Sequence, residues 1–320
     1  MTMDRPQLVL RLAAVAGIAV LAVAPWMVSL YKVHVLNILI INIIMATSLN
    51  LIMGYAGQFA KANVAFMGLG AYTMGVLVTR ADWSFWFAWP AGALLAAGVG
   101  TLVALPALRL RGLYLAIITI SFVLIVHWSF LHARFITGGA TGFSVPHPNY
   151  FGLPVPNTLA TYYLSLLTLL GAMWIVRNLV ASGFGRSLLC IAEQELVAPA
   201  LGINVYRTKI AVFALSGLLA GFAGGLHAIT LQFIDPQNFW LLQLVVQLCM
   251  VALGGVASIL GSVLGASIMT LLIEVLRAFK GLWEFAIGTI LLLTIVFFPR
   301  GIAGLIEHFF PTLRERRHRP

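Results

Sequence analysis

Long apolar stretches, separated by short polar segments, occupy almost the whole chain. Residues 113–126, for example, are apolar on every face, whereas the strands of a membrane β-barrel alternate polar and apolar residues. A helix also satisfies all its backbone hydrogen bonds within one segment. The pattern therefore predicts an all-α polytopic membrane bundle of about ten transmembrane helices. The predicted spans are residues 12–30, 33–54, 63–79, 85–108, 112–133, 157–176, 208–231, 239–253, 260–276 and 283–298.

The composition leads to the same class of protein. Of the 320 residues, 61% are hydrophobic and 9% are charged, and the mean hydropathy is +1.02. So few polar side chains cannot cover the surface of a soluble globular protein. The composition therefore excludes a cytosolic enzyme, and residues 1–320 are expected to form a single transmembrane domain.

The net charge of +10 predicts an orientation in the bilayer rather than a nucleic-acid partner. If the amino terminus is cytoplasmic and the chain crosses ten times, 14 of the 19 Lys and Arg residues, Lys61 among them, fall inside and 5 outside. This asymmetry obeys the positive-inside rule. Both termini are then cytoplasmic, and the basic tail at 307–320 lies near anionic headgroups. The first apolar stretch, with Ala-Val-Ala at 22–24, also resembles a cleavable signal peptide, and both readings keep the later orientation.

Two polar segments are long enough to carry functions outside the bilayer. Residues 134–156 are rich in Gly and Pro and are predicted to form a periplasmic loop. Residues 177–209 hold the longest charged stretch and are predicted to form a cytoplasmic loop. Because loops on a rigid scaffold often carry binding residues, 177–209 is a candidate docking surface for a soluble partner.

Motifs for catalysis and nucleotide hydrolysis are absent. The chain has no G-x-x-x-x-G-K-[ST] loop, G-x-S-x-G elbow, H-E-x-x-H pair or C-x-x-C. His127 and His132 are separated by a rotation of about 140° around a helix, so they do not face one ligand. Cys190 and Cys249 resemble neither a disulfide framework nor a metal cluster. We expect no cofactor, no metal site and no enzymatic activity in this chain.

Two acidic residues, Glu274 and Glu284, lie within the predicted spans. Glu274 precedes Arg277 by three residues and Glu284 follows Lys280 by four, spacings that place each pair on one helix face. Local ion pairing is therefore one interpretation. The other is a proton or ion relay, because intramembrane carboxylates often serve transport.

Glycine-rich segments at 54–72 and 253–267 interrupt the apolar runs. Helices are expected to be broken or closely packed there. Small residues for tight helix crossing are one interpretation, and a water-filled translocation path is the other, because irregular backbone is tolerated along such a path. The occurrence of one glycine-rich segment in each half of the chain indicates a weak internal repeat. The candidate path residues are Gly57, Gln58, Asn63, Gly68, Gly70, Gly254, Gly255 and Ser262.

Four stretches resemble the M-type permease subunits of branched-chain amino acid ABC importers. They are LNLIMGYAGQFAKANVAFMGLGAY (49–72), LRLRGLYLAIITISF (108–122) followed by TGGATGF (137–143), GFGRSLLCIAEQELVAPALGINVYRTKIAVFALSGLLAGFAGGLHA (183–228), and GGVASILGSVLGA (254–266) with FFPRGIAGLI (297–306). The third stretch is the most specific, because hydropathy alone does not produce its order of charged, small and glycine residues.

The resemblance implies that the loop at 183–209 is a cytoplasmic coupling loop, whose short helix docks into an ATPase subunit. Small side chains allow close seating in a groove, and Gly202 is suited to end the helix in a left-handed conformation. An amphipathic helix lying on the headgroups is the alternative. Arg186, Arg207 and Lys209 are expected to hold this lever at the membrane surface. The implied contact residues are Glu193, Glu195, Ala198, Ala200 and Gly202.

Two departures from the family pattern concern the lever and the path. Pro199 falls where the family more often has a helix former, so the coupling helix should bend or restart there. The usual Gly-Gln-Leu-Ser-Leu-Gly-His pattern reads GQFAKAN at 57–63. The loss of a Ser, a Gly and a His changes the polar groups that would select the solute.

The resemblance implies an importer in a bacterial inner membrane. Its other parts would be an H-type permease, two cytoplasmic ABC ATPases and a periplasmic substrate-binding protein, with TGGATGF at 137–143 as a docking surface or a plain turn. A permease for urea or another small amide is the alternative within the superfamily. A stand-alone secondary transporter using Glu274 is the alternative of another class, and a membrane enzyme is the third.

Overall fold

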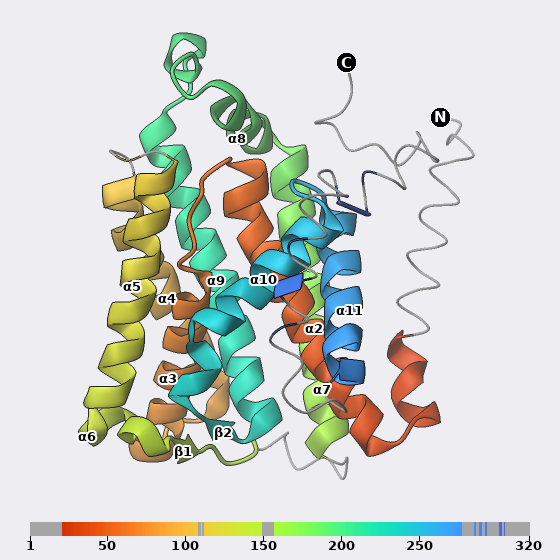
Figure 1. Cartoon of the computed structure of the whole chain (residues 1–320). Coiled ribbons are helices and arrows are strands. Elements are labelled where there is room, and N and C mark those ends of the chain that lie inside the picture. Colours follow the sequence, from red (N-terminus) through yellow and green to blue (C-terminus); the bar gives the residue numbers. More distant parts are fainter. Residues whose placement is uncertain are drawn as a thin grey trace.

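The computed structural model describes residues 21–107, 110, 112–148 and 157–276, with isolated positions from 285 to 304, and it is an all-helical bundle (Figure 1). Its elements are α2 (Leu30–Asn50), the π-helix η1 (Leu51–Tyr55), α3 (Asn63–Arg80), α4 (Phe85–Ala107), α5 (Leu113–His132), α6 (Arg134–Thr137), the 3-10 helix η2 (Gly139–Thr141), β1 (Phe143–Ser144), α7 (Asn157–Ala181), α8 (Gly183–Gln194), the 3-10 helix η3 (Ala198–Leu201), α9 (Val205–Leu231), β2 (Phe233–Ile234), the 3-10 helix η4 (Pro236–Phe239), α10 (Leu241–Gly254) and α11 (Ile259–Leu276).

Eight of the ten predicted spans coincide with helices, and their bounds differ by five residues or fewer. Among the described residues, six helices are long and apolar enough to cross a membrane: Leu30–Tyr55, Phe85–Pro106, Leu113–His132, Asn157–Ala181, Val205–Leu231 and Ile259–Leu276. The helix α10 is shorter and apolar. Residues 12–20 of the first predicted span, most of the span 283–298 and the tail 307–320 lie outside the described residues, and residues 21–27 are helical. The count of ten therefore stays a prediction.

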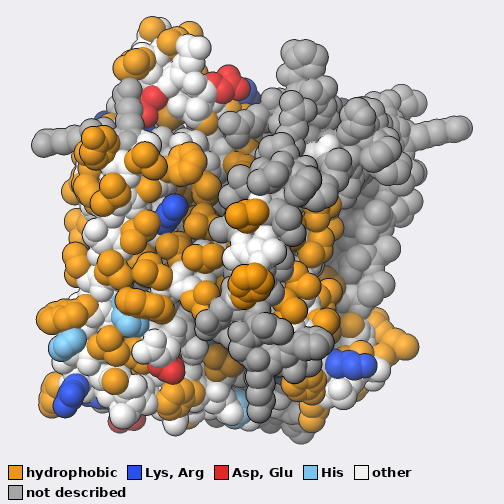
Figure 2. Space-filling view, viewed as in Figure 1, with side chains coloured by type: hydrophobic (Ala, Val, Ile, Leu, Met, Phe, Trp, Pro, Cys, Tyr) orange, Lys and Arg blue, Asp and Glu red, His pale blue; other side chains and the backbone are white. Residues whose placement is uncertain are grey.

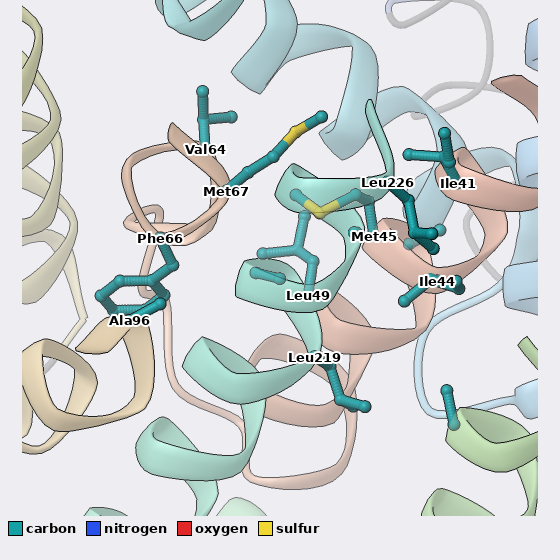
Figure 3. Packing of buried hydrophobic residues seen from close by; sticks show 14 of the residues in the cluster. Ile41, Ile44, Met45, Leu49, Val64, Phe66, Met67, Ala96, Leu219 and Leu226 are labelled. Atoms are coloured by element: carbon teal, nitrogen blue, oxygen red, sulfur yellow. The ribbon is translucent and has the colours of Figure 1, made fainter. Parts of the chain in front are cut away.

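The centre of the bundle is built from α2, α3, α4 and α9. The helix α9 packs against the other three, and α2 also packs against α7, α10 and α11. Figure 3 shows buried side chains of α2, α3 and α9 meeting there, among them Met45, Met67 and Leu226. Dispersion contacts at this density hold the helices together, because lipid tails are as apolar as the side chains.

The central helix α2 also carries buried amide side chains. Asn37 donates through Nδ2 to Thr230 Oγ1 of α9 at 3.0 Å, and Asn42 donates to Thr270 Oγ1 of α11 at the same distance. Interhelical hydrogen bonds of this kind contribute roughly 0.6 to 2 kcal/mol each in membranes. They fix which faces of α9 and α11 meet α2.

The two long polar segments lie at opposite ends of the bundle (Figure 1). The helix α8 and η3 lie at one end, called the α8 end, and α6, β1 and β2 lie at the other. Strand β1 pairs with β2 antiparallel, with Phe143 opposite Ile234 and Ser144 opposite Phe233. Hydrophobic side chains predominate on the face between these ends (Figure 2). The described part of the 134–156 loop is a tight turn, since Gly138, Gly139 and Gly142 all have positive φ.

The glycine-rich segments interrupt helices, as the sequence predicts. The first helix ends at Tyr55, residues 56–62 are not helical, and α3 begins at Asn63. In the second segment, α10 gives way to a turn at Gly255–Ser258 before α11 begins at Ile259. Both breaks coincide with positive φ angles, at Gly57 in the first and at Gly255 and Ala257 in the second.

Candidate functional site

The segment from α8 to η3 is shaped by local sequence signals. Ser182 caps α8, its Oγ accepting a hydrogen bond from the Phe184 N–H at 3.2 Å. The helix ends before Pro199, and η3 restarts with this proline in its first turn, which confirms the predicted interruption. Gly202 is in the left-handed conformation as expected, and its N–H donates to Pro199 O at 3.0 Å. Asn204 then caps α9 through Oδ1, which accepts from the Arg207 N–H at 3.0 Å.

The tip of this segment exposes large apolar side chains. Leu196 is 78% exposed and Leu201 is 67% exposed, and Val197 between them is also exposed. Figure 1 shows this tip projecting beyond the ends of the neighbouring helices. Exposed apolar groups on a projection of this kind are typical of a protein-protein contact. These leucines were not among the contact residues predicted from the sequence, where their only signal was apolar residues within the longest charged stretch.

The predicted coupling residues occupy different environments in this segment. Glu193, Arg186, Ala200, Gly202 and Arg207 are exposed. Ala198 is fully buried beneath the tip. In this conformation, the exposed residues of this set are therefore the ones that a partner protein can contact directly.

Glu195 makes an ion pair within the chain. Its Oε1 accepts from Lys209 Nζ at 2.8 Å, and the side chains are 15% and 1% exposed. Lys209 lies in the second turn of α9, so this pair joins the α8–η3 segment to a bundle helix. A buried ion pair of this geometry acts as a rigid connection, because separating the partners would leave an uncompensated charge buried in the protein.

Residues 56–62, called here the re-entrant segment, return from the α8 end into the bundle (Figure 1). At the end of this segment, Asn63 Nδ2 donates to Met45 O at 3.2 Å. Met45 precedes the end of η1 at Tyr55 by ten residues, which is about 15 Å along a helix. The helix α3 therefore begins deep in the membrane-spanning part of the molecule.

Burial alternates from residue to residue along the re-entrant segment, which turns at Gly57, where φ is +64°, and at Phe59, where the Ala60 N–H donates to Gln58 O at 2.7 Å. Ala56, Gln58, Ala60 and Ala62 are buried. Gly57 and Phe59 are exposed and Lys61 is partly exposed, and we call Phe59 and Lys61 the outward face of the segment. The Gln58 Nε2 group, predicted to line a path, donates to Ala56 O at 3.2 Å within the chain.

Asn63, another predicted path residue, joins a buried polar cluster with Ser48 of α2 and Ser216 of α9. Its Oδ1 accepts from Ser48 Oγ at 3.1 Å and from Ser216 Oγ at 3.0 Å. The two hydroxyl oxygens lie 2.9 Å apart, and the hydroxyls of Ser48 and Ser216 lie 2.8 Å and 3.0 Å from the backbone carbonyl of the other serine, so each single hydroxyl proton is shared between Asn63 Oδ1 and that carbonyl. This cluster holds the start of α3 between α2 and α9.

We expect Ser216→Ala to lower the free energy of unfolding by about 1 kcal/mol, the usual scale of such a bond in a membrane protein. Ser165→Ala is the matched control, because Ser165 is equally buried but its Oγ has no hydrogen-bond partner among the described residues. Unfolding titrations in detergent measure both. Equal effects of the two substitutions would contradict a stabilising role for the cluster.

Ser262 lies in a second polar cluster that joins the two glycine-rich segments. Asn50, at the end of α2, donates through Nδ2 to Ser262 Oγ at 2.8 Å and to Ser258 O at 2.9 Å. Its Oδ1 accepts from the Ala257 N–H at 2.8 Å. One amide side chain thus fixes the turn between α10 and α11 against the start of the first break.

The remaining predicted path glycines lie at close contacts. Gly68 is beside the rings of Phe130 and Phe239, and a Cβ at Gly70 would meet the backbone of Gly221 in α9. A Cβ at Gly254 would meet the backbone of Gly261, and Gly255 adjoins Gly301. These contacts favour the tight-crossing interpretation for all four glycines, Gly68, Gly70, Gly254 and Gly255.

Gly57 connects the re-entrant segment to α8. Its φ is +64°, and a Cβ there would lie 2.8 Å from both Cα and Cβ of Ala192. The helix α8 also packs against η1. The interrupted helix and the α8–η3 segment therefore touch directly at a point where no side chain fits.

Of the two acidic residues predicted to lie within spans, Glu274 is among the described residues and Glu284 is not. Tyr31 donates to Glu274 Oε1. Arg277, Lys280 and Glu284 lie outside the described residues, so the predicted ion pairs stay predictions.

The two histidines of α5 stack on different aromatic partners. The His127 ring packs against Trp240, and the His132 ring packs against Trp128. Among the residues that the structure describes, no three His, Cys, Asp or Glu side chains gather in a group that could hold a metal ion.

Comparison with known proteins gives a consistent match. A family model described as "Branched-chain amino acid transport system / permease component" matches residues 31–298. The chain is 31% identical over 311 residues to the high-affinity branched-chain amino acid transport system permease protein LivM of Escherichia coli (strain K12), with 89% of this chain and 73% of that protein covered.

Two other relatives match about half of the chain. The xylose transport system permease protein XylH of Escherichia coli (strain K12) is 34% identical over 155 residues, covering 46% of this chain and 37% of that protein. The autoinducer 2 import system permease protein LsrC of Klebsiella pneumoniae is 30% identical over 154 residues, covering 46% and 44%. No solved structure matches.

Proposed function

Because the chain belongs to the branched-chain amino acid transport system permease family, we propose that it is the M-type permease subunit of an ABC importer for branched-chain amino acids. It is a non-catalytic, multi-pass membrane subunit. In this proposal it forms half of the translocation path, while ATP hydrolysis takes place in partner subunits.

The contact between Gly57 and Ala192 is the observation that carries this proposal. It joins a projecting, apolar-tipped segment outside the bilayer to a broken helix inside it. Coupling of ATP hydrolysis to transport needs a connection of this kind. The Glu195–Lys209 pair supports the same role, because it makes the projecting segment move together with α9.

The proposal assigns the α8 end to the cytoplasm of a bacterium. Arg177, Arg186 and Arg207 at this end supply positive charge, which cytoplasmic surfaces of membrane proteins favour. One of the two ABC ATPases would receive the exposed tip at Leu196 and Leu201, together with Glu193 and Ala200. The opposite end would face a periplasmic substrate-binding protein.

An H-type permease would cover the outward face of the re-entrant segment. Non-helical backbone at membrane depth is tolerated only where protein or a water-filled path covers it. Phe59 on this face is 51% exposed in the isolated chain, so a second subunit and the path between the two fit here. The candidate path residues Gln58, Asn63 and Ser262 would then lie buried on the inner side of this segment and hold it in place.

In this mechanism, closure of the ATPases displaces α8 and thereby the re-entrant segment. A nucleotide shifts the equilibrium between two states only through different affinity for them. The tip must therefore make different contacts with the ATPases in the two states. The contact at Gly57 transmits that difference to the path.

Replacing Leu196 and Leu201 with Glu tests the proposed docking site. We expect the double variant to reach the membrane in normal amount but to lose most ATP-dependent uptake of L-leucine, because the few hot-spot residues at the centre of an interface each contribute roughly 2 kcal/mol or more. Co-purification of the ATPases should fall in parallel.

Gln194→Glu is the matched control, because it adds negative charge to the same exposed segment and removes no apolar side chain. It should bind the ATPases and import L-leucine like the wild type. Normal ATPase binding and uptake in the Leu196/Leu201 variant would refute docking at this tip.

A further inference from the structure

Lys61 places a basic side chain within the membrane-spanning part of the bundle. Its backbone N–H donates to Thr119 Oγ1 at 2.9 Å. Thr119 lies six residues from the start of α5, which is about 9 Å along a helix of about 30 Å. The sequence alone assigned Lys61 to a loop at the cytoplasmic surface, and the return of the re-entrant segment into the bundle accounts for the difference.

The charge of Lys61 has no counter-ion within the described part of the chain, where no hydrogen bond or ion pair of its ammonium group is found. It lies on the outward face of the re-entrant segment together with Phe59. A charged side chain at membrane depth is unfavourable in lipid, and such residues usually face a path or a partner and mark the route of a solute.

The chemistry of this face combines a cation with an apolar ring. An ammonium group donates up to three hydrogen bonds, and charge-assisted bonds to a carboxylate are stronger than those to a neutral group. The Phe59 side chain, two residues away in the chain, is 51% exposed and offers an apolar surface on the same segment.

We propose that Lys61 recognises the carboxylate group of the transported solute. The inference rests on the proposed permease function and adds a specificity-determining residue to it. Lys61 binds the carboxylate as the solute passes the re-entrant segment, and Phe59 contacts an apolar part of the same molecule.

Uptake by the complete transporter tests the proposal with L-leucine and urea as probes. We expect the wild type to import L-leucine and not urea. Lys61→Met should lower the maximal rate of L-leucine uptake roughly tenfold or more, the scale of one lost charge-assisted bond. Lys61→Arg, which keeps the charge, should retain most of the rate.

Two controls separate recognition from structure. Lys32→Met removes an exposed basic residue at the other end of the bundle and should leave uptake unchanged. Thermal unfolding of Lys61→Met should match the wild type, because no ion pair of Lys61 is lost. The half-saturating concentration of L-leucine should also stay unchanged if the periplasmic protein sets it.

The outcomes are distinct. Wild-type uptake by Lys61→Met would overturn the proposal and place the ammonium among lipid headgroups, which a long side chain can reach. Import of urea but not L-leucine by the wild type would also overturn it. Absence of ATP-dependent uptake of both probes by the wild type would instead refute the permease function on which the inference rests.

Discussion

Gly57→Ala is expected to uncouple transport from ATP hydrolysis while leaving the protein folded and in the membrane. The new Cβ would lie 2.8 Å from Ala192 Cα and Cβ, and the residue would keep a φ of +64°, which side chains disfavour. Strain of roughly 1–3 kcal/mol at such a position shifts an equilibrium between two states about 5- to 150-fold. ATP-dependent uptake in vesicles, measured together with ATP hydrolysis, should show lost uptake with continuing hydrolysis.

Gly202→Ala is the matched control for this prediction. Gly202 has a φ of +76°, but a Cβ there meets no atom within 4 Å. Both substitutions therefore carry backbone strain, and only the first creates the overlap with α8. Similar uptake in the two variants would show that the Gly57–Ala192 contact has no part in coupling.

Glu195→Leu is expected to destabilise the protein by roughly 3 kcal/mol, because it leaves the ammonium of Lys209 buried without its carboxylate. Removing the charge of Lys209 as well should recover most of the lost free energy of unfolding. Glu195→Leu combined with Lys209→Met removes both charges, and apolar replacement of a complete buried pair is often nearly neutral. Unfolding free energies of the wild type, both single variants and the double variant form the cycle that isolates the pair.

Glu193→Leu controls for the substitution itself, since Glu193 is exposed on the same segment. Its unfolding free energy should match that of the wild type. A double variant no more stable than Glu195→Leu would show that Glu195 acts through contacts other than Lys209. Uptake assays on the double variant then show whether the contact between residues 195 and 209 must be an ion pair to transmit motion.

The helices could be predicted from the sequence because each is encoded locally. A run of apolar residues long enough to span the bilayer satisfies its own backbone, so neither partner nor register has to be known. The interruption at Pro199 and the left-handed Gly202 are local in the same sense. The break after Tyr55 was expected from its glycines, although its return into the bundle was not.

The contacts that define the candidate site could not be predicted in this way. Gly57 and Ala192 are far apart in the chain, and nothing in either residue specifies the other. Glu195 was expected to contact a partner protein, and its bond to Lys209 of α9 was not foreseen. Leu196 and Leu201 were overlooked because leucine in a membrane protein is ordinarily explained by lipid. Each case depends on long-range geometry, which one sequence does not contain.

The buried amides of α2 constrain how the protein is made. Asn37, Asn42 and Asn50 find their partners 193, 228 and 208 residues later in the chain. At a synthesis rate of about 5–20 residues per second, these side chains wait roughly 10 to 45 seconds before their partners leave the ribosome. During biogenesis, α2 therefore needs a temporary polar neighbour, such as water or an insertion factor, until α9 and α11 arrive.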